Sequence, residues 1–522
     1  MPIFDRVLGI EGTAWNLSSA VFGDRLLSLH SHAYAPPYGG IHPREAAQHH
    51  ASTLREVVGR TLADVPEIDG VAFSVGPGLG PCLRTVATAA RALAIAYHVP
   101  LIAVNHCIAH VEIGRYATGS RDPVVLYASG ANTQVIGYLK GRYRIFGETL
   151  DIGLGNALDK FARGKGLPHP GGPVVEDLAK GGRYIELPYT VKGMDLAFSG
   201  LVSAAKDSCA PIEDVCCGLQ ETSFAMCVEV TERALAYSGK EEVLLVGGVG
   251  ANKRLQEMLA QMSNDRNAHF FVPETRFLGD NGAMIAYTGK LMLEYGCETP
   301  IASSQINPSF RSDQVTVTWR DVDEPRISVK KPQFQTRGAE AVVSLENETV
   351  IKRRVPKPYR VAQLDRRLIA ERTRTEAKAI ANARRAGVPT PVIKDITKDT
   401  IVMENVSGIV LSEQLEPGLL REAGRMVGKL HSSGIVHGDL TTGNLIVRDG
   451  QIVVIDFGLS QVTSEIEPRG VDIHVLFQTL ESTTDEYPAL RQAFAEGYCD
   501  TFSGAREVLS REQEILGRAR YL

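Results

Sequence analysis

The stretch VLGIEGT at Val7–Thr13 leads from an apolar run into a turn of small residues, and a second strand-like run follows at Leu17–Phe22. A turn of this kind between two strands exposes backbone N–H groups that can hold a phosphate. SGANT at Ser129–Thr133 repeats the arrangement after the apolar run VVLY, and GGVGAN at Gly247–Asn252 ends a third run before a helical segment. One such turn is a weak signal. Three of them in strand context predict a phosphate- or nucleotide-binding domain.

Short apolar runs and helical stretches alternate around these turns. The segments Pro81–Ala96 and Gln220–Tyr237 carry a helical period between runs that suit buried strands. Such alternation predicts an α/β fold built in layers. From Ser312 to Arg337 the sequence becomes polar, charged and interrupted by proline. We therefore predict an α/β domain at residues 1–311, a linker at 312–337 and a second domain at 338–522.

Composition sets the broad class of the protein. The chain has 522 residues, of which 44% are hydrophobic and 22% charged, and its net charge is −5, all within the range of globular proteins. Its eight cysteines form no C-x-x-C pair, and no secretory signal precedes them, so we expect a reducing, cytoplasmic compartment. The longest apolar stretch, Val86–Val104, contains Arg91 and His98. These interruptions argue against a membrane span.

The segment NHCIAH at Asn105–His110 is a candidate metal site. Histidines at positions i and i+4 project from one face of a helix and can reach one cation. A zinc protease of the H-E-x-x-H type needs a glutamate after the first histidine, and Cys107 stands there instead. The pattern therefore favours a metal site without the base of peptide hydrolysis. Asp280, in the run LGDNG, is the best candidate for an oxygen ligand.

These motifs, with SVGPGLGPCLRT, ETLDIGLGNALDKFAR, PGGPVVE and DLAFSGL between them, occur in one order over residues 1–311. The set resembles the archaeal and eukaryotic branch of the universal tRNA threonylcarbamoyladenosine synthase family. Bacterial members are called TsaD, and this branch supplies the catalytic subunit of the KEOPS complex. The resemblance implies the ASKHA fold of actin and Hsp70, in which two ribonuclease-H-like lobes enclose a cleft.

The resemblance also implies site residues. His106 and His110 are expected to bind one iron or zinc ion, with Tyr127 and Asp280 close to the same ion. A set of His, Asp and Tyr suits both metals, so the sequence does not choose between them. The cleft for threonylcarbamoyl-AMP is implied to comprise Tyr127, Ala128, Ser129, Gly130, Ala131, Asp159, Gly172, Glu176 and Asn252.

The implied reaction transfers a threonylcarbamoyl group from its AMP anhydride to N6 of the adenosine 3′ of the anticodon, in tRNAs that read codons beginning with A. Glu11 stands in the first phosphate turn, where actin-like ATPases and sugar kinases carry an aspartate. The longer side chain fits poorly with an ordinary kinase role for this domain and agrees with the family. The expected partners are tRNA, threonylcarbamoyl-AMP, the small KEOPS subunits and a separate threonylcarbamoyl-AMP synthase.

The second domain carries a set of kinase motifs in order. HGDLTTGN at His437–Asn444 resembles H-R-D-x-x-x-x-N, with Asp439 as base and Asn444 as magnesium ligand, and Asp456 of D-F-G supplies a second magnesium carboxylate. Lys352 of the run VIK resembles the strand lysine that holds nucleotide phosphates, and Glu376 is its expected ion-pair partner. The nucleotide loop is expected at Gly338, Ala339, Glu340 and Ala341.

Two departures separate this domain from ordinary protein kinases. The nucleotide loop lacks the pattern G-x-G-x-x-G, and no A-P-E follows Gly458. The domain resembles the small Bud-type KEOPS kinase, for which ATP hydrolysis in support of tRNA modification is as plausible as protein phosphorylation. The basic run Lys352–Arg385 and the tail Arg518–Leu522 are then expected to face tRNA. The implied cofactors of this domain are ATP and Mg²⁺.

Three other interpretations compete with this one. A regulatory Ser/Thr kinase with a ligand-sensing N-terminal domain remains the main alternative, although His106, His110 and Asp280 form an intact ligand set. A metalloprotease is disfavoured because HCIAH lacks the base. A tRNA-binding scaffold is disfavoured because both domains carry sets of catalytic residues.

Overall fold

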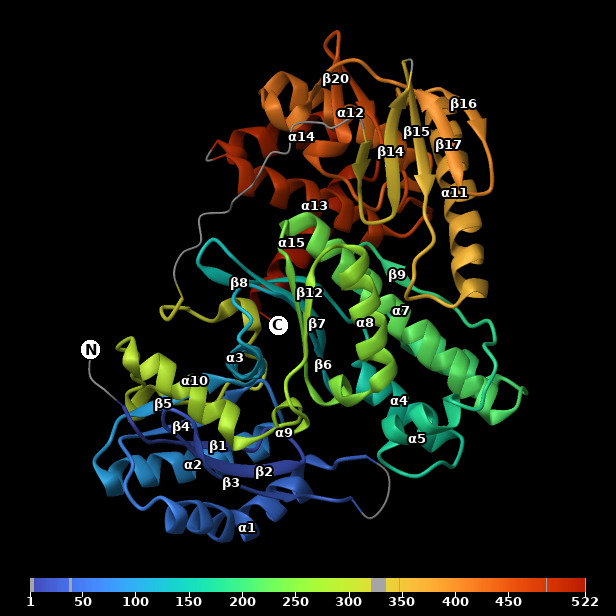
Figure 1. The fold of residues 1–522 in the computed structure, drawn as a ribbon. Helices are drawn as coiled ribbons and strands as arrows, with labels where there is room; N and C mark the ends of the chain where they lie inside the picture. The colour runs from blue at the N-terminus through green and yellow to red at the C-terminus, as the bar shows by residue number, and fades with distance from the viewer. Residues whose placement is uncertain (1–3, 37–39, 321–334, 347, 485, 522) are drawn as a thin grey trace. The chain divides into compact units, whose positions relative to one another are not determined.

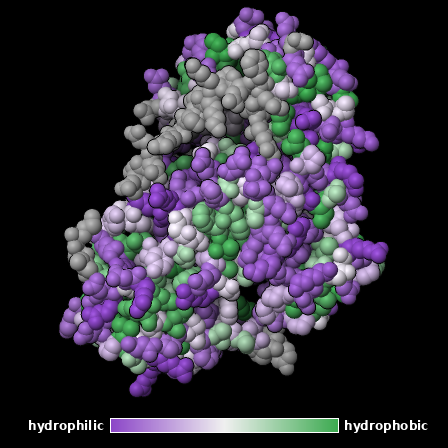
Figure 2. Space-filling view, in the orientation of Figure 1, coloured by the Kyte–Doolittle hydropathy of each residue, from purple (hydrophilic) through white to green (hydrophobic). Residues whose placement is uncertain are grey.

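The computed structural model describes residues 4–36, 40–320, 335–346, 348–484 and 486–521 (Figure 1). The chain divides into two compact units, Met1–Ser328 with Pro358–Val361, and Val329–Lys357 with Ala362–Leu522. Each unit is described by itself below. In the view of Figure 2, hydrophilic side chains cover most of the visible surface and hydrophobic ones form smaller groups between them. Among the described residues, no helix is long and apolar enough to cross a membrane.

The first sheet has the strand order β3-β2-β1-β4-β5. β1 pairs antiparallel with β2 and parallel with β4, so hairpin strands and crossover strands meet at β1. Helices α1 and α2 pack on one face of this sheet and α10 on the other (Figure 1). The elements are β1 (Val7–Glu11), β2 (Asn16–Phe22), β3 (Leu26–Ala33), α1 (Pro43–Asp64), β4 (Gly70–Gly76), α2 (Gly80–Tyr97), β5 (Leu101–Asn105) and α10 (Gly282–Glu294).

The alternation of β1 decides which way Glu11 points. Leu8 and Ile10 belong to the core under α1 and α2, whereas Val7 belongs to the core under α10. Because successive side chains of a strand face opposite sides, Gly9 and Glu11 share the α10 side with Val7. A Cβ on Gly9 would lie 2.2 Å from the backbone nitrogen of Ala286, so only glycine lets α10 approach so closely.

The second sheet repeats this plan with the order β12-β11-β6-β7-β8. β6 pairs antiparallel with β7 and parallel with β11, as β1 does with β2 and β4. The elements are α3 (His106–Thr118), β6 (Val124–Ala128), β7 (Thr133–Leu139), β8 (Arg142–Glu148), α4 (Leu154–Gly164), α5 (Gly171–Ala179), β9 (Val191–Lys192), β10 (Asp195–Leu196), α6 (Ser199–Asp207), α7 (Ile212–Ser238), β11 (Glu242–Val246), α8 (Lys253–Asp265), β12 (His269–Phe271) and α9 (Thr275–Leu278).

The two sheets therefore share one topology, in which a three-stranded antiparallel part is followed by two parallel strands. This is the duplicated ribonuclease-H-like plan, and the prediction of an ASKHA-type α/β fold is confirmed. β6 separates the two cores of the second lobe. Val124, Leu126 and Ala128 face the cluster that includes α7, whereas Val125 and Tyr127 face the cluster that includes α3. This alternation turns Tyr127 towards the helix that carries the two histidines.

The first part of the predicted linker is folded into the first unit. Val315 and Trp319 are buried in the cluster around α3 and β6, and the Trp319 indole N–H donates to Glu112 at 2.8 Å. The polar composition of the segment predicted a linker. It gave no sign of the packing of Val315 and Trp319, because their partners lie far away in the sequence. Residues 321–334 of the predicted linker lie outside the described residues.

The second unit has a sheet of order β13-β14-β15-β17-β16 together with α11, and a mainly helical part that follows it (Figure 1). This is the α+β, two-lobed arrangement predicted for a kinase-like domain. The elements are β13 (Gln335–Arg337), β14 (Ala341–Glu346), β15 (Thr349–Arg354), α11 (Ala362–Arg385), β16 (Ile393–Ile396), β17 (Thr400–Glu404), β18 (Ile409–Val410), α12 (Pro417–Ser432), β19 (Ile435–Val436), β20 (Leu445–Arg448), β21 (Gln451–Val454), β22 (Gln461–Val462), α13 (Ile466–Thr483), α14 (Tyr487–Thr501) and α15 (Ala505–Tyr521).

Candidate functional site

The start of α3 positions the two histidines of the candidate metal site. Asn105 caps the helix, because its side chain accepts a hydrogen bond from the Ile108 N–H at 3.1 Å. His106 is the first helical residue and His110 lies one turn later, so both rings project from one face, with their centroids 4.9 Å apart. His110 is fully buried and His106 is 5% exposed. The helix thus presents two imidazoles inside the protein.

Asp280 joins the two histidines from the segment between α9 and α10. Its Oδ1 lies 3.2 Å from His110 Nε2 and 3.5 Å from His106 Nε2. One ligand atom from each of the three residues lies within 4.8 Å of the others. Two imidazole nitrogens and a carboxylate oxygen converging in this way form a set suited to zinc or iron.

Glu11 contacts the ring nitrogen of His106 that faces away from Asp280. Its Oε2 lies 3.2 Å from His106 Nδ1, while its Oε1 accepts from the N–H and hydroxyl of Thr13 at 2.8 and 2.6 Å. A carboxylate on the second ring nitrogen fixes the tautomer and orientation of a metal-binding histidine. This role of Glu11 escaped the sequence analysis, and the alternation of β1 was the available signal for the face on which it lies.

Tyr127 completes the environment of His110. The two rings lie 5.1 Å apart, and the fully buried Tyr127 hydroxyl has no hydrogen-bond partner among the described residues. A buried polar atom without a partner is costly, and a ligand at this site would satisfy it. The orphaned hydroxyl and the His/His/Asp donor set therefore fit a bound metal ion with a further ligand.

The charges of the cluster are strongly coupled. Burial opposes the charged form of His106, but the carboxylates of Glu11 and Asp280 outweigh it and raise the pKa of this imidazole to about 9. Burial lowers the pKa of His110, although Asp280 acts in the opposite direction. The pKa of Asp280 is lowered because the two imidazoles outweigh its burial. Burial raises the pKa of Tyr127 well above its usual value, so the phenol stays protonated.

The second phosphate turn lies beside this cluster. The turn at Ser129–Asn132 closes through a hydrogen bond from the Ser129 N–H to the Asn132 carbonyl at 2.8 Å, so the Ser129 amide is already engaged. The Asn132 side chain reaches Cys107 Sγ on α3 at 3.9 Å. A Cβ on Gly155 would lie 2.8 Å from the Cα of Gly130, so glycine lets the start of α4 pack against the turn. The amides of Gly130 and Ala131 remain the candidates for a phosphate or oxyanion.

The other predicted cleft residues lie in α4, in α5 and at the start of α8. Asp159 Oδ1 accepts from the Gly171 N–H at 2.7 Å at the start of α5, next to Gly172. Glu176, one turn further along α5, accepts from the Lys253 N–H at 2.8 Å. The adjacent Asn252 caps α8 and donates to Gln220 at 3.1 Å. These residues therefore form a second group, whose polar atoms also serve structural hydrogen bonds.

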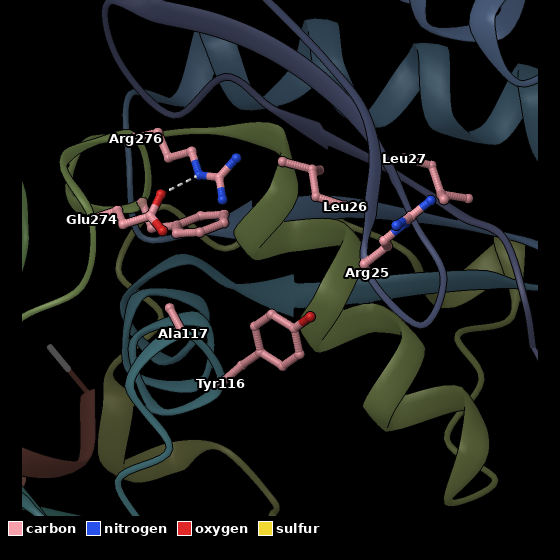
Figure 3. A pocket seen from close by; sticks show the side chains of 8 residues that line it. Arg25, Leu26, Leu27, Tyr116, Ala117, Glu274 and Arg276 are labelled. Carbon is pink, nitrogen blue, oxygen red and sulfur yellow. Dashed lines mark ion pairs between the residues drawn. The ribbon is translucent and has the colours of Figure 1, made fainter.

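A surface pocket of the first unit lies elsewhere (Figure 3). It is bounded by the far end of α3, where Tyr116 and Ala117 lie, by the start of β3 and by α9. Arg276 pairs there with Glu274 at 2.8 Å, as the dashed line of Figure 3 marks. The residues that line it include none of the predicted site residues, so we do not assign it to the candidate site.

The kinase-like unit brings its predicted phosphate-binding lysine together with the predicted partner of this lysine and one predicted magnesium ligand. Lys352 Nζ lies 2.7 Å from Glu376 and 2.6 Å from Asp456, and Arg354 also contacts Glu376 at 2.6 Å. Burial opposes ionisation of Asp456, but the nearby Lys352 ammonium lowers the pKa of this carboxyl to about 2. Asp456 has a φ of 59°, a left-handed conformation unusual for a residue other than glycine. The carboxylate is thus fixed and charged.

The predicted catalytic loop is held from its backbone. Asn444 Nδ2 donates to the carbonyl of Asp439 at 2.8 Å and lies 3.3 Å from its carboxylate. Asp472 accepts from the N–H groups of His437 and Gly438 at 2.6 and 2.8 Å. Asp439 and Asn444 are therefore neighbours, as a base and a magnesium ligand must be. Asp472 is a supporting residue to which the sequence analysis gave no role.

The predicted nucleotide loop is a tight hairpin turn. Gly338–Ala341 joins β13 to β14, and the Gly338 N–H donates to the Ala341 carbonyl at 3.0 Å. Arg372 lies 3.3 Å from Glu340 and ties the turn to α11. The loop is thus short and braced, in keeping with the absence of the flexible glycine pattern.

The expected basic surface needs one correction. Lys352, Arg354, Lys357 and Arg360 are all buried, so among the basic residues in the first part of the run only Arg353 is exposed. Their ion pairs and hydrogen bonds, such as that of Arg354 with Glu376, explain the burial. Exposed bases remain along α11 at Arg366, Arg374, Lys378, Arg384 and Arg385. The side chains of Arg518–Leu522 lie outside the described ones.

Comparison with known proteins identifies the families that the two parts of the chain match. Residues 25–287 match the family model TsaD, described as tRNA N6-adenosine threonylcarbamoyltransferase, and residues 345–473 match the RIO domain. A relative from Methanoculleus marisnigri is 68% identical over 100% of this chain and 99% of its own length. One from Methanospirillum hungatei is 65% identical over 99% of both chains. Both are named probable bifunctional tRNA threonylcarbamoyladenosine biosynthesis protein.

Among solved structures, the activator of the 2-hydroxyisocaproyl-CoA dehydratase from Clostridium difficile aligns with 55% of this chain and 94% of its own. Its TM-score of 0.35 and 12% identity are too low to bear on the site. The family matches and the full-length relatives are sufficient to assign the chain to a family. By its TsaD domain, its RIO domain and its identity to these relatives, the chain belongs to the family of bifunctional tRNA threonylcarbamoyladenosine biosynthesis proteins.

Proposed function

We propose that the protein transfers the threonylcarbamoyl group of threonylcarbamoyl-AMP to N6 of the adenosine 3′ of the anticodon in tRNAs that read codons beginning with A. Its kinase-like unit supports or regulates this transfer by ATP hydrolysis or phosphorylation. The observation that carries the proposal is the buried set of His106, His110 and Asp280 beside the phosphate turn. It lies in a chain that matches the TsaD family across this domain.

His106 and His110, with Asp280 and Tyr127, would hold one iron or zinc ion. Such an ion supplies Lewis-acid stabilisation to an oxygen that gains negative charge. Glu11 accepts the Nδ1 proton of His106 and so keeps its Nε2 directed towards Asp280. The protein's own contribution is to hold these donors in a buried site, where electrostatic interactions are strong.

In the transfer, N6 of adenosine attacks the carbamoyl carbonyl carbon. The new C–N bond forms, the C–O bond to the AMP phosphate breaks, and N6 loses one proton. The amides of Gly130 and Ala131 are positioned to stabilise developing oxyanion charge, and Asp159 and Glu176 to bind ribose hydroxyls. Cys107 is buried in the apolar cluster behind α3, so it does not offer a nucleophile to the cleft. Direct transfer without an acyl-enzyme is therefore proposed.

For the kinase-like unit, we propose ATP and Mg²⁺ as ligands, with Lys352 on the phosphates, Asp456 and Asn444 on the metal, and Asp439 as base. The braced Lys352, Glu376 and Asp456 set supports this assignment. The exposed bases of α11 favour tRNA as the polyanion bound by this unit. Arg384 and Arg385 are the test residues, although Arg384 donates to the Thr390 carbonyl at 2.7 Å and Arg385 to the Asn382 side chain at 3.0 Å.

The proposal also covers the domain limits, the location and the partners of the protein. We propose a kinase-like domain at 338–522, a cytoplasmic location, and assembly with the small KEOPS subunits. The first domain extends beyond the predicted limit of 311, since Val315 and Trp319 pack in its core. Threonylcarbamoyl-AMP is taken to come from a separate synthase.

The decisive experiment follows labelled threonine into tRNA. Purified full-length protein receives a threonylcarbamoyl-AMP-generating enzyme and the small subunits, and wild type is compared with His106→Ala and Asp439→Ala. Transfer by wild type and its loss in His106→Ala are expected, and Asp439→Ala reports whether ATP turnover is required. If wild type transfers no threonine but phosphorylates a partner protein, the regulatory-kinase alternative replaces this proposal. A covalent acyl-enzyme found by intact mass would exclude direct transfer.

A further inference from the structure

The exposed face of α4 carries an asparagine and two bases in a line that starts at the second phosphate turn. The N–H groups of Gly155 and Asn156 donate to the carbonyls of Ser129 and Gly130 at 3.0 and 2.9 Å, so the helix begins against the turn. A Cβ on Gly130 would lie 3.4 Å from Asn156 Oδ1. The helix therefore runs away from the turn whose amides we propose to act on the substrate.

Helical geometry places Asn156, Lys160 and Arg163 on one side of α4, because residues three and four apart share a face. At 1.5 Å per residue, Lys160 lies about 6 Å and Arg163 about 10 Å further along the helix axis than Asn156. All three residues are exposed. The opposite face packs in the core of the second lobe through Leu154, Ala157, Leu158, Phe161 and Ala162. The packed face therefore fixes which way the line points.

The two bases of the line are not neutralised within the part of the chain that the structure describes. The side chains of Lys160 and Arg163 form no ion pair or hydrogen bond with another described residue. The only acid of α4, Asp159, precedes Arg163 by four residues, but its Oδ1 accepts from the Gly171 N–H at 2.7 Å at the start of α5. Two unpaired cations on one face favour a ligand that carries successive negative charges.

The far end of the line lies next to the first lobe. A Cβ on Gly40, in the segment before α1, would lie 3.5 Å from Arg163 Nη1. The guanidinium of Arg163 is thus within contact distance of the first lobe, although it belongs to the second. A polyanion that follows the line would have one end at the phosphate turn and the other at a point where the two lobes meet.

We propose that Asn156, Lys160 and Arg163 bind the phosphate backbone of the anticodon loop, next to the adenosine that receives the threonylcarbamoyl group. This inference rests on the proposed function, which makes tRNA the substrate. Lysine and arginine contacts to phosphates supply affinity and fix the register of the RNA without reading its sequence. The asparagine amide can donate to a phosphate or ribose oxygen. A single-stranded loop suits such a line, because its backbone can follow a basic surface while its bases turn away.

The test measures RNA binding apart from transfer. Full-length protein with the small KEOPS subunits is titrated with a fluorescent anticodon stem-loop at several salt concentrations. Lys160→Ala and Arg163→Ala should each weaken binding and lower the slope of log K against log salt by about 1, and the double variant by about 2. Lys160→Arg keeps the charge and should bind as wild type does. Arg142→Ala is the matched control, because Arg142 is exposed at the end of β8 away from Glu148, which pairs with Gln134 beside the turn.

Threonine transfer separates the two possible sources of phosphate. In the double variant the KM for tRNA should rise, whereas kcat at saturating tRNA and the KM for threonylcarbamoyl-AMP should not change. A rise in the KM for threonylcarbamoyl-AMP alone would assign the bases to that nucleotide and overturn the inference, as would RNA affinity and salt slope equal to those of wild type. If wild type binds the stem-loop but transfers no threonine, the proposed function fails, and the binding series still decides this inference. Circular dichroism checks that each variant is folded.

Discussion

The candidate metal centre of the first unit and the cation site of the kinase-like unit use similar carboxylates in different surroundings. The side chain of Asp280 is 16% exposed and lies against two buried imidazoles. The side chain of Asp456 is 47% exposed and lies against one lysine. Both carboxyls have lowered pKa values, because neighbouring cationic side chains stabilise their charged forms.

The difference indicates two modes of cation binding. A site enclosed by His106, His110 and Tyr127 suits an ion that stays with the protein, because its ligands are buried and already converge. An exposed carboxylate held by a lysine suits an ion that arrives and leaves with a nucleotide, since the phosphates must supply the remaining ligands. The following predictions test this contrast.

The largest effect is expected for His110→Ala. Removal of this fully buried ligand should abolish retention of the metal in the first unit and lower threonine transfer about 1,000-fold or more, because Lewis-acid stabilisation is worth several kcal/mol. Metal analysis and the transfer assay provide the measurement. The exposed His269→Ala is the matched control and should behave as wild type. Full metal content in His110→Ala would contradict the assignment.

A smaller effect is expected for Asp456→Asn, and it should appear in ATP turnover and not in metal retention. ATP turnover should fall about 100-fold or more, since the variant loses a magnesium carboxylate, whereas metal retention by the first unit should not change. Asp449→Asn is a matched control, because Asp449 is exposed and has a φ of 52° that asparagine tolerates. If Asp456→Asn also lost the tightly held metal, the two sites would not be independent.

Glu11→Gln tests the residue that orients His106 in the candidate metal site. The variant keeps an oxygen near His106 Nδ1 but loses the charge, so metal affinity should fall about 10- to 100-fold. Competition with a chromophoric chelator measures this affinity. Glu67→Gln, which affects only an exposed pair with Arg6, serves as the control. An unchanged affinity would show that Glu11 has no part in orienting His106.

The smallest effect concerns pH and the buried His50. Its pKa is lowered from 6.5 to about 4 in the folded protein, so the unfolded chain binds more protons between these values. The contribution of neutral His50 to the free energy of unfolding is therefore fully present above pH 6.5. It is lost as the pH falls towards 4, by up to about 2 kcal/mol between pH 7 and 5. Hydrogen exchange of β1 and β2 amides can follow this loss. A His50→Gln variant should show a weaker pH dependence; an equal dependence would assign it to other groups.

The glycine turns after apolar strands and the alternation around them were enough to predict a layered α/β fold, whereas the ASKHA plan came from the family resemblance. The spacing of His106 and His110 was enough to place both on one helical face. The role of Glu11 was missed because its partner enters from a helix that begins 95 residues later. The folded start of the predicted linker was missed for the same reason, since Trp319 is anchored by Glu112. Local patterns predicted the elements, whereas long-range pairing decided which polar residues support the site.

After β5 the chain passes between the two sheets of the first unit through α3, through the segment from β12 to α10, and again near Ser312, which donates to Gln134 of β7. The first passage carries His106 and His110, and the second carries Asp280. An ion bound by these three residues would fasten the first two crossings to each other. Metal loading should therefore restrain movement of the two lobes against each other, and chelation should increase that movement even where no substrate is present.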